Sequence, residues 1–278
     1  MAAYDLPGIS CSFPSAGVLL IELNRAPVNA FNTSLWVNTA SAFDQASEDP
    51  EVRAIVFGSK LEKGFTAGLD LMESNLNEKG SDPARTALLL KPYIKLLQDS
   101  VSSIQNCSKP VVAATHGICL GAGIDLISAC DIRLCSEKTV FSIKEVDIGL
   151  AADVGSLQRL PKVTGNASLL YELALTARNF GPEEAVKLGL VSNVVKGSRE
   201  EVTKEAIKLA TLIASKSPIA TLSTKHLLNY SREHSVQEGL DYTAVWNMSM
   251  LQAEDIPLAF QAFSTKKPAK FPKLASKL

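Results

Sequence analysis

Residues 110–126 have the sequence PVVAATHGICLGAGIDL, and the fold class follows from them. The first five, Pro110 to Ala114, form a short apolar run that is typical of a buried β-strand. A turn containing Gly121 and Gly123 comes next, and the apolar run over 124–129 favours a helix. The order of strand, glycine turn and helix predicts one βα unit of an α/β protein.

This turn also has a chemical property. Backbone N–H groups at a glycine turn and in the first helical turn have no partner within the helix, so they can hold a developing negative charge on oxygen. A dinucleotide site is the alternative, because Gly121 and Gly123 supply two of its glycines and Glu145 lies 20 residues after Asp125. Position 126, however, is Leu where that motif needs a small residue, which argues against NAD.

Similar strand and helix patterns occur in the sequence before and after residues 110–126. Trp36, Ala40 and Phe43 recur at helical spacing and predict a helix. Further buried strands are predicted over 18–23, 54–57, 132–135 and 140–142. After Pro161, helices are predicted over 166–177, 182–188, 200–215, 218–231, 235–250 and 256–263. We therefore predict an α/β core with the active site over residues 1–195 and a helical region over 196–278, with a mobile loop that leads into a helix over 73–100.

Composition excludes several classes of protein. With 28 Lys+Arg against 29 Asp+Glu, the chain has a formal net charge of −1, which argues against a nucleic-acid partner. The longest uncharged apolar stretch lies between Lys109 and Asp125, and its 15 residues are too few for a membrane span. Five cysteines without CxxC spacing predict neither a disulfide framework nor a zinc site.

The two ends of the sequence indicate the cellular compartment in which we expect the protein. No basic stretch followed by an apolar core occurs at the N-terminus, so we expect no secretion signal. Ser276-Lys277-Leu278 matches a peroxisomal address, which predicts the peroxisome as the location and its import receptor as a partner.

A second glycine turn occurs over 64–71, with the sequence GFTAGLDL. It predicts unpaired amides of the same kind, and Asp70 is expected to help open a following helix. A simple strand-to-helix connection is the alternative.

Carboxylates among small and apolar residues mark the segment KEVDIGLAADVG over 144–155. Burial of Glu145 and Asp153 would raise their pKa values towards working pH, as proton transfer requires. Asp125 adds a third acid if the turns meet. Alternatively, Asp147 and Asp153 cap helices, and Glu145 pairs with Lys144 or Arg159.

Together these segments resemble the enoyl-CoA hydratase/isomerase (crotonase) family. The resemblance includes 23–25, 29–32, 65–71, 109–113, 121–123, 129–133, 157–161 and 189–191. It implies a crotonase-like spiral of ββα turns, a C-terminal helical region for trimer contacts and a hexamer made of two trimers. Ala122 stands where the family usually has Gly, and the amide donor survives that change.

The family resemblance also implies an acyl-CoA substrate. Its thioester oxygen would accept hydrogen bonds from the Leu69 and Ala122 amides, which form the oxyanion hole. The implied CoA-binding residues are Arg25, Asn29, Ala67, Gly68, Leu69, Asp70 and Leu71. Lys266, Lys267 or Lys270, from the same or a neighbouring subunit, would meet the CoA phosphates.

Within the family, segment 144–155 is most similar to the Δ3,5-Δ2,4-dienoyl-CoA isomerases, whereas ordinary hydratases have Gly where Asp153 stands. This resemblance implies Glu145 as the base at C2, Asp153 as the acid at C6 and Asp125 in support, without metal or nicotinamide. A hydratase or a Δ3,Δ2-enoyl-CoA isomerase is the nearest alternative, and a non-catalytic acyl-CoA-binding subunit is another.

Overall fold

The computed structural model describes residues 4–73 and 79–274. Its large sheet has six strands in the order β1-β2-β3-β5-β7-β9, and a smaller sheet has the order β4-β6-β8. Among the described strands of the large sheet, β1 alone runs antiparallel to its neighbour. The strands are β1 (Ile9–Ser15), β2 (Val18–Leu23), β3 (Ala54–Ser59), β4 (Gly64–Thr66), β5 (Val111–Thr115), β6 (Ile118–Leu120), β7 (Ile132–Ser136), β8 (Val140–Ser142) and β9 (Asn193–Val195).

The strand order is that of a spiral. In each of three consecutive units, the first strand joins the large sheet and the second joins the small sheet, and a helix follows. The first unit is β3-β4-α2 (Pro83–Asn106), and the second is β5-β6-α3 (Ala122–Ser128). The third is β7-β8, followed by the 3₁₀ helix η2 (Glu145–Ile148) and α4 (Ser156–Val163). The expected spiral of ββα turns is therefore confirmed.

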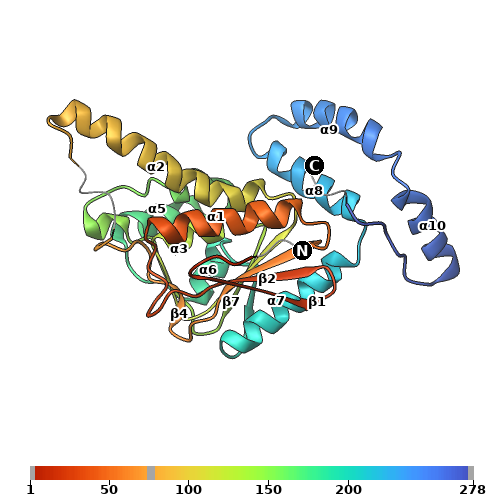
Figure 1. Ribbon diagram of the computed structural model, residues 1–278, viewed down its shortest axis with the longest axis horizontal. Helices are drawn as coiled ribbons and strands as arrows, with labels where there is room; N and C mark the ends of the chain where they lie inside the picture. The colour runs from red at the N-terminus through yellow and green to blue at the C-terminus, as the bar shows by residue number, and fades with distance from the viewer. Residues whose placement is uncertain (1–3, 74–78, 275–278) are drawn as a thin grey trace.

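The large sheet is buried on both faces because its apolar residues alternate between two cores. Leu19 and Ile55 face the core covered by α1 and α2, whereas Leu20 and Val56 face the core covered by α7. Figure 1 shows α1 and α7 on opposite sides of this sheet. The helices are α1 (Thr33–Glu48), α2 (Pro83–Asn106), α3 (Ala122–Ser128), α4 (Ser156–Val163), α5 (Ala167–Thr176), α6 (Pro182–Leu188), α7 (Arg199–Ala214), α8 (Pro218–Ser231), α9 (Val236–Met250) and α10 (Asp255–Thr265).

Segment 73–100, predicted as a loop that leads into a helix, does contain a helix: α2 begins at Pro83, capped by the Asp82 side chain, and continues past Pro92. Residues 74–78 of that loop lie outside the described residues. Helix α4 was not predicted, because a glycine precedes it and Pro161 lies within it.

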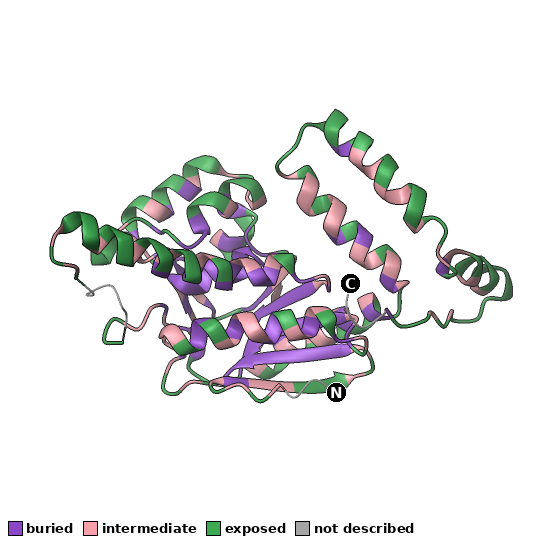
Figure 2. Cartoon of the chain, turned by 45° about the horizontal axis from the view of Figure 1, so that its top comes forward, coloured by how far each residue is buried: buried purple, intermediate pink, exposed green. Residues whose placement is uncertain are grey.

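The C-terminal helices separate into two groups. Helix α7 packs on the large sheet through Val202, Ala206, Ala210 and Ala214, although it follows the boundary predicted after residue 195. Helices α8, α9 and α10 extend away from the sheets, and Figure 2 shows mostly exposed and intermediate residues on them. The division into parts 1–195 and 196–278 stays a prediction. Nowhere in 4–73 or 79–274 is a helix both long enough and apolar enough to cross a membrane.

Candidate active site

A cavity of about 360 Å³ lies where the three ββα units meet α1. Its wall is mostly apolar, yet it includes all three acids predicted from the sequence and both glycine turns. The lining residues are Trp36, Ala67, Gly68, Leu69, Leu71, Ile94, Leu97, Leu120, Gly121, Ala122, Asp125, Lys144, Glu145, Asp147, Ile148, Leu150, Asp153 and Val154.

The two glycine turns lie against each other because β4 and β6 are parallel neighbours. A methyl group added to Gly68 would lie 3.0 Å from Leu120 O and 3.6 Å from the Ala122 amide nitrogen. Within the described part of the chain, neither the Leu69 amide nor the Ala122 amide donates a hydrogen bond. The cavity wall therefore holds two N–H groups that are available to an oxygen acceptor.

Backbone conformation at the second turn requires glycine. Gly121 precedes α3 with φ 50° and ψ −115°, a region that side chains exclude. A methyl group there would also lie 3.3 Å from Glu145 Oε1. Gly121 thus frees the first amide of α3 and brings the Glu145 carboxyl close to this turn.

Asp125 is fully buried in α3. Its Oδ1 accepts hydrogen bonds from the Ser156 amide and hydroxyl, both at 2.6 Å, while Oδ2 has no partner among the described residues. Burial raises the pKa of Asp125 to about 6, and the nearby Asp153 charge adds to the rise. Hydrogen bonds from Ser156 and the Arg159 charge act in the opposite direction.

Glu145 begins η2, and its Oε2 is buried without a partner among the described residues. Burial raises the pKa of Glu145 to about 7, with repulsion from Asp125 and then Asp153 as further causes. A carboxylate with a pKa near working pH can take up and release a proton during turnover.

Asp153 lies two residues before the N-cap of α4. Its backbone carbonyl accepts a hydrogen bond from Gln98 Nε2 of α2 at 2.8 Å. Partial burial raises the pKa of Asp153, but its side chain is exposed to solvent, unlike that of Asp125.

The alternative in which these acids only cap helices or form ion pairs is wrong. Lys144 pairs with Asp147 at 2.8 Å, and Arg159 donates to Gln105 and Ser102. In residues 4–73 and 79–274, Glu145 and Asp153 form no ion pair. Asp153 caps no helix, because the Ser156 amide that begins α4 donates to Asp125.

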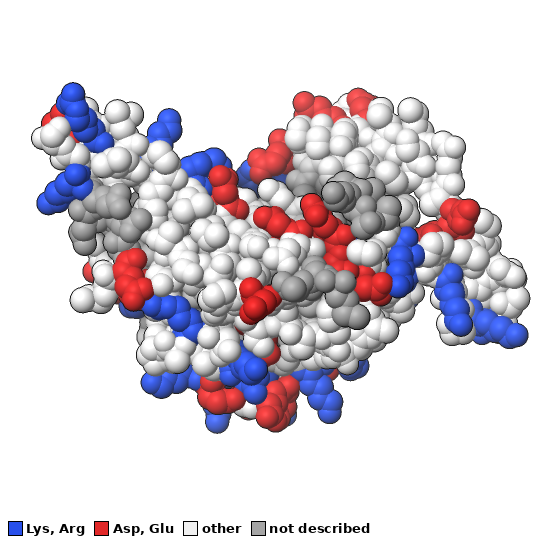
Figure 3. Space-filling model, in the orientation of Figure 1, with Lys and Arg blue, Asp and Glu red and all other residues white. Residues whose placement is uncertain are grey.

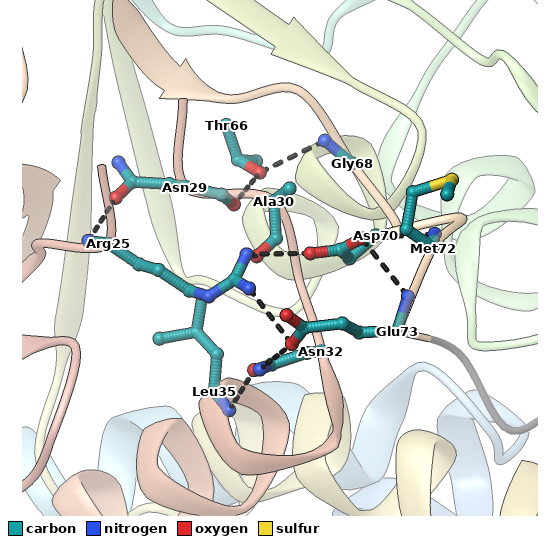
Figure 4. A network of polar contacts seen from close by, with 10 residues as sticks. All are labelled: Arg25, Asn29, Ala30, Asn32, Leu35, Thr66, Gly68, Asp70, Met72 and Glu73. Carbon is teal, nitrogen blue, oxygen red and sulfur yellow. Dashed lines mark hydrogen bonds and ion pairs between the residues drawn. The ribbon is translucent and has the colours of Figure 1, made fainter. Parts of the chain in front are cut away.

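Arg25 and Asn29 do not line the cavity, and Figure 4 shows them bracing its loop. Arg25 donates to Asp70 Oδ2 at 2.8 Å and to Glu73 at 3.1 Å. Asn29 is fully buried, and its side-chain nitrogen donates to Ser59 Oγ and Phe65 O at 2.8 and 2.9 Å. The structure gives both residues a positioning role, and their contact with CoA stays a prediction.

Asp70 does not open a helix, which corrects the sequence expectation. Its Oδ1 accepts from the Met72 and Glu73 amides in a turn, and Oδ2 accepts from Arg25. The ion pair with Arg25 holds the Asp70 carboxylate in place. The residue before Asp70, Leu69, forms a parallel β-bridge with Phe31, so the chain here is extended and not helical.

The sequence did not identify several residues that line the cavity. Ile94 and Leu97 come from α2, and Trp36 comes from α1 with an indole N–H that has no partner in the described structure. Apolar helical spacing identified Trp36 as a core residue but gave no sign that a cavity lies beside it. Lys266, Lys267 and Lys270 do not line this cavity, so their contact with CoA phosphates also stays a prediction.

Comparisons with known proteins agree with this geometry. The profile of the enoyl-CoA hydratase/isomerase family matches residues 14–273. A mitochondrial Delta(3,5)-Delta(2,4)-dienoyl-CoA isomerase of Homo sapiens is 49% identical over 257 residues, covering 91% of this chain and 78% of that protein. A peroxisomal one of Arabidopsis thaliana is 42% identical over 279 residues, with 99% of both chains covered. The crystal structure of an enoyl-CoA hydratase from Bacillus anthracis superposes with a TM-score of 0.86 at 26% identity, covering 95% of this chain and 99% of that one. The chain therefore belongs to the enoyl-CoA hydratase/isomerase family.

Proposed function

We propose that this protein is a Δ3,5-Δ2,4-dienoyl-CoA isomerase. The observation that carries the proposal is a pair of carboxyl groups, Glu145 and Asp153, that have no ion partner among the described residues and lie on the wall of an apolar cavity. Two amides without a partner in the same part of the chain face this cavity. Curated relatives with that name, 49% and 42% identical over most of the chain, support the same activity.

The reaction moves two double bonds and needs two separated proton-transfer groups. In our proposal, Glu145 removes a proton from C2, and the electron pair delocalises onto the thioester oxygen as a dienolate. Asp153 then donates its proton to C6, which leaves the 2,4-diene conjugated with the carbonyl. One carboxylate cannot easily reach both carbons, which explains why the cavity has an acid at each of two positions.

The Leu69 and Ala122 amides would hold the oxygen on which negative charge develops. Fixed donors of this kind lower a barrier by roughly 3–4 kcal/mol each. Asp125 acts through its neighbours: it fixes the start of α4 and, by its charge, raises the pKa of Glu145. Because the proposed reaction is a redox-neutral proton shift, it requires no nicotinamide or metal.

We also propose that the CoA part lies along the loop of Ala67 to Leu71, braced by Arg25 and Asn29. Gly68 and Leu69 line the cavity at this loop, which supports entry of the thioester from that side. Substitution of Lys266, Lys267 and Lys270 by Ala tests their role: a higher KM for the CoA ester with unchanged kcat is expected.

Exposed apolar side chains on α9 and α10 support a homo-oligomer. Met248, Phe260 and Phe263 are 68%, 70% and 87% exposed. Large exposed apolar surfaces mark interaction sites, and Figure 3 shows mostly uncharged atoms over α9. We propose that these helices join the subunits into a hexamer made of two trimers. Light scattering measures the mass of the oligomer, and the wild type is compared with Phe263→Asp. A monomeric wild type would contradict the proposal.

We infer the peroxisome as the compartment. The Arabidopsis relative is named peroxisomal, whereas relatives from Homo sapiens and Rattus norvegicus are named mitochondrial. Ser276-Lys277-Leu278 lies outside the described residues. A fluorescent protein fused before residue 1 should enter peroxisomes and lose that location when 276–278 are deleted; mitochondrial fluorescence would contradict the inference.

One assay tests the activity. Purified protein is mixed with a 3,5-dienoyl-CoA, and the absorbance of the conjugated 2,4-dienoyl product is followed. Formation of the product is expected. Hydration of a 2-enoyl-CoA without dienoyl turnover would favour a hydratase, and tight binding without turnover would indicate a non-catalytic subunit.

A further inference from the structure

A second cavity, of about 570 Å³, adjoins the proposed active site. Asp153 and Val154 line both cavities. The two differ in character, because the second is bounded mainly by polar and charged side chains. These residues are Lys95, Gln98, Ser102, Gln105, Gln158, Arg159, Lys162, Arg232 and Glu233, together with Gly155.

Several of the side chains that bound the second cavity contact one another. Lys162 pairs with Glu233, and the Arg159 guanidinium donates to Gln105 and Ser102 at 2.9 Å each. The polar groups are thus bound to one another along the walls and do not fill the centre. A polar cavity of this size has room for several water molecules with hydrogen-bond partners on all sides.

The acids differ in their access to this space. Asp153 is exposed and lies at the boundary of the two cavities. Asp125 is fully buried, and Glu145 Oε2 is buried without a partner among the described residues. Neither Asp125 nor Glu145 lines the second cavity. An acyl chain in the first cavity would therefore cover Glu145 but leave Asp153 in contact with the polar side.

We propose that the second cavity is the proton-supply route of Asp153, so that the hydrogen delivered to C6 comes from solvent through this cavity. The inference rests on the proposed isomerase function. As the C6–H bond forms, the Asp153 O–H bond breaks, and the carboxylate then takes a proton from water in the second cavity. Glu145 releases the proton from C2 to solvent through the first cavity once product has left. One proton enters and one leaves, so the cycle is balanced.

The test is a rapid-mixing experiment with labelled solvent. Enzyme equilibrated in H₂O is mixed with 3,5-dienoyl-CoA in excess D₂O, and the first-turnover product is analysed for deuterium at C6. Asp153 exchanges with solvent before the reaction, so we expect C6 of the wild-type product to carry deuterium. Gln158→Trp fills the cavity from α4, and Lys95→Trp fills it from α2, without altering the lining of the first cavity.

In each filling variant, Asp153 can regain a proton only through the first cavity after product has left, so we expect kcat to be lowered roughly tenfold, with a new solvent isotope effect and unchanged KM. Lys204→Trp, at an exposed lysine of α7 that lines neither cavity, is the matched control and should behave as wild type. Product with protium at C6 in the wild type, or equal kcat in all variants, would overturn the proposal. Absence of any 2,4-dienoyl product would instead refute the isomerase function itself.

Discussion

Asp125 Oδ1 accepts both the amide and the hydroxyl hydrogen bond of Ser156, each at 2.6 Å. This contact joins α3 to the first residue of α4 and fixes the chain three residues after Asp153. It also leaves Asp125 Oδ2 without a partner among the described residues. The same carboxyl group therefore positions one proposed proton-transfer acid, Asp153, and acts electrostatically on the other, Glu145.

Asp125→Asn should shift the pH dependence of turnover. The Asp125 charge is the second cause, after burial, of the raised pKa of Glu145. A base works only when deprotonated, so activity falls as pH drops through that pKa. Removal of the charge lowers the pKa of Glu145, and the acid limb of kcat/KM should move to lower pH. An unchanged limb would show that Asp125 and Glu145 are not coupled.

Glu145→Gln and Asp153→Asn should each reduce kcat by about 10²- to 10⁴-fold, the usual contribution of a general acid or base. Glu183→Gln is the matched control, because Glu183 is an exposed carboxylate of α6 that does not line the cavity. It should retain wild-type rates. Far-ultraviolet circular dichroism verifies the fold of all three variants. A wild-type rate in either the Glu145→Gln or the Asp153→Asn variant would remove the substituted residue from the mechanism.

The raised pKa of Glu145 also predicts a pH-dependent gain in stability for Glu145→Gln. Between pH 4.5 and about 7, folded protein keeps the proton that the unfolded chain has lost. The free energy of unfolding contributed by Glu145 therefore falls as pH rises through this window, by about 3 kcal/mol at most. The melting temperature of the variant, relative to wild type, should be higher at pH 8 than at pH 5. Equal differences at both pH values would contradict this account.

Much of the fold was predictable because most strands of the large sheet are continuous apolar runs. The range predicted for β2 is the observed one, and α6 begins at Pro182 and ends before Gly189 as expected. Strand β1 gave no such signal, since it is an edge strand with half-exposed residues. Helix α4 begins at Ser156, whose amide donates to Asp125, 31 residues earlier, and local sequence could not show this contact.

The candidate site was predictable to a similar extent. Glu145 and Asp153 stood out because carboxylates rarely occur in apolar surroundings without a role. The apolar wall formed by Ile94 and Leu97 could not be predicted, because α2 reaches the cavity only through tertiary packing. The expected helix after Asp70 was wrong, because its ion pair with Arg25 lies 45 residues apart in sequence.

Asn29 should be required for stability through both its backbone and its side chain. Its φ of 52° is in the left-handed region, and its side chain donates to Ser59 and Phe65. Asn29→Ala loses these bonds and strains the backbone, whereas Asn29→Gly loses only the bonds. We expect both variants to unfold at lower urea concentration, with Ala about 1 kcal/mol less stable than Gly. Equal stability would show that the backbone conformation relaxes.

Lys225 should anchor the C-terminal helices to the core. Its ammonium group, on α8, pairs with Asp131 Oδ2 at 2.9 Å and donates to Lys109 O at 3.0 Å, and its side chain is only 6% exposed. Lys225→Met would leave the Asp131 charge in a mostly buried position without its partner, so we expect a loss of about 3–5 kcal/mol in unfolding free energy. Lys216→Met, at an exposed lysine just before α8, is the control and should unfold like wild type. If Lys225→Met unfolds like its control, the buried pair does not hold α8 in place.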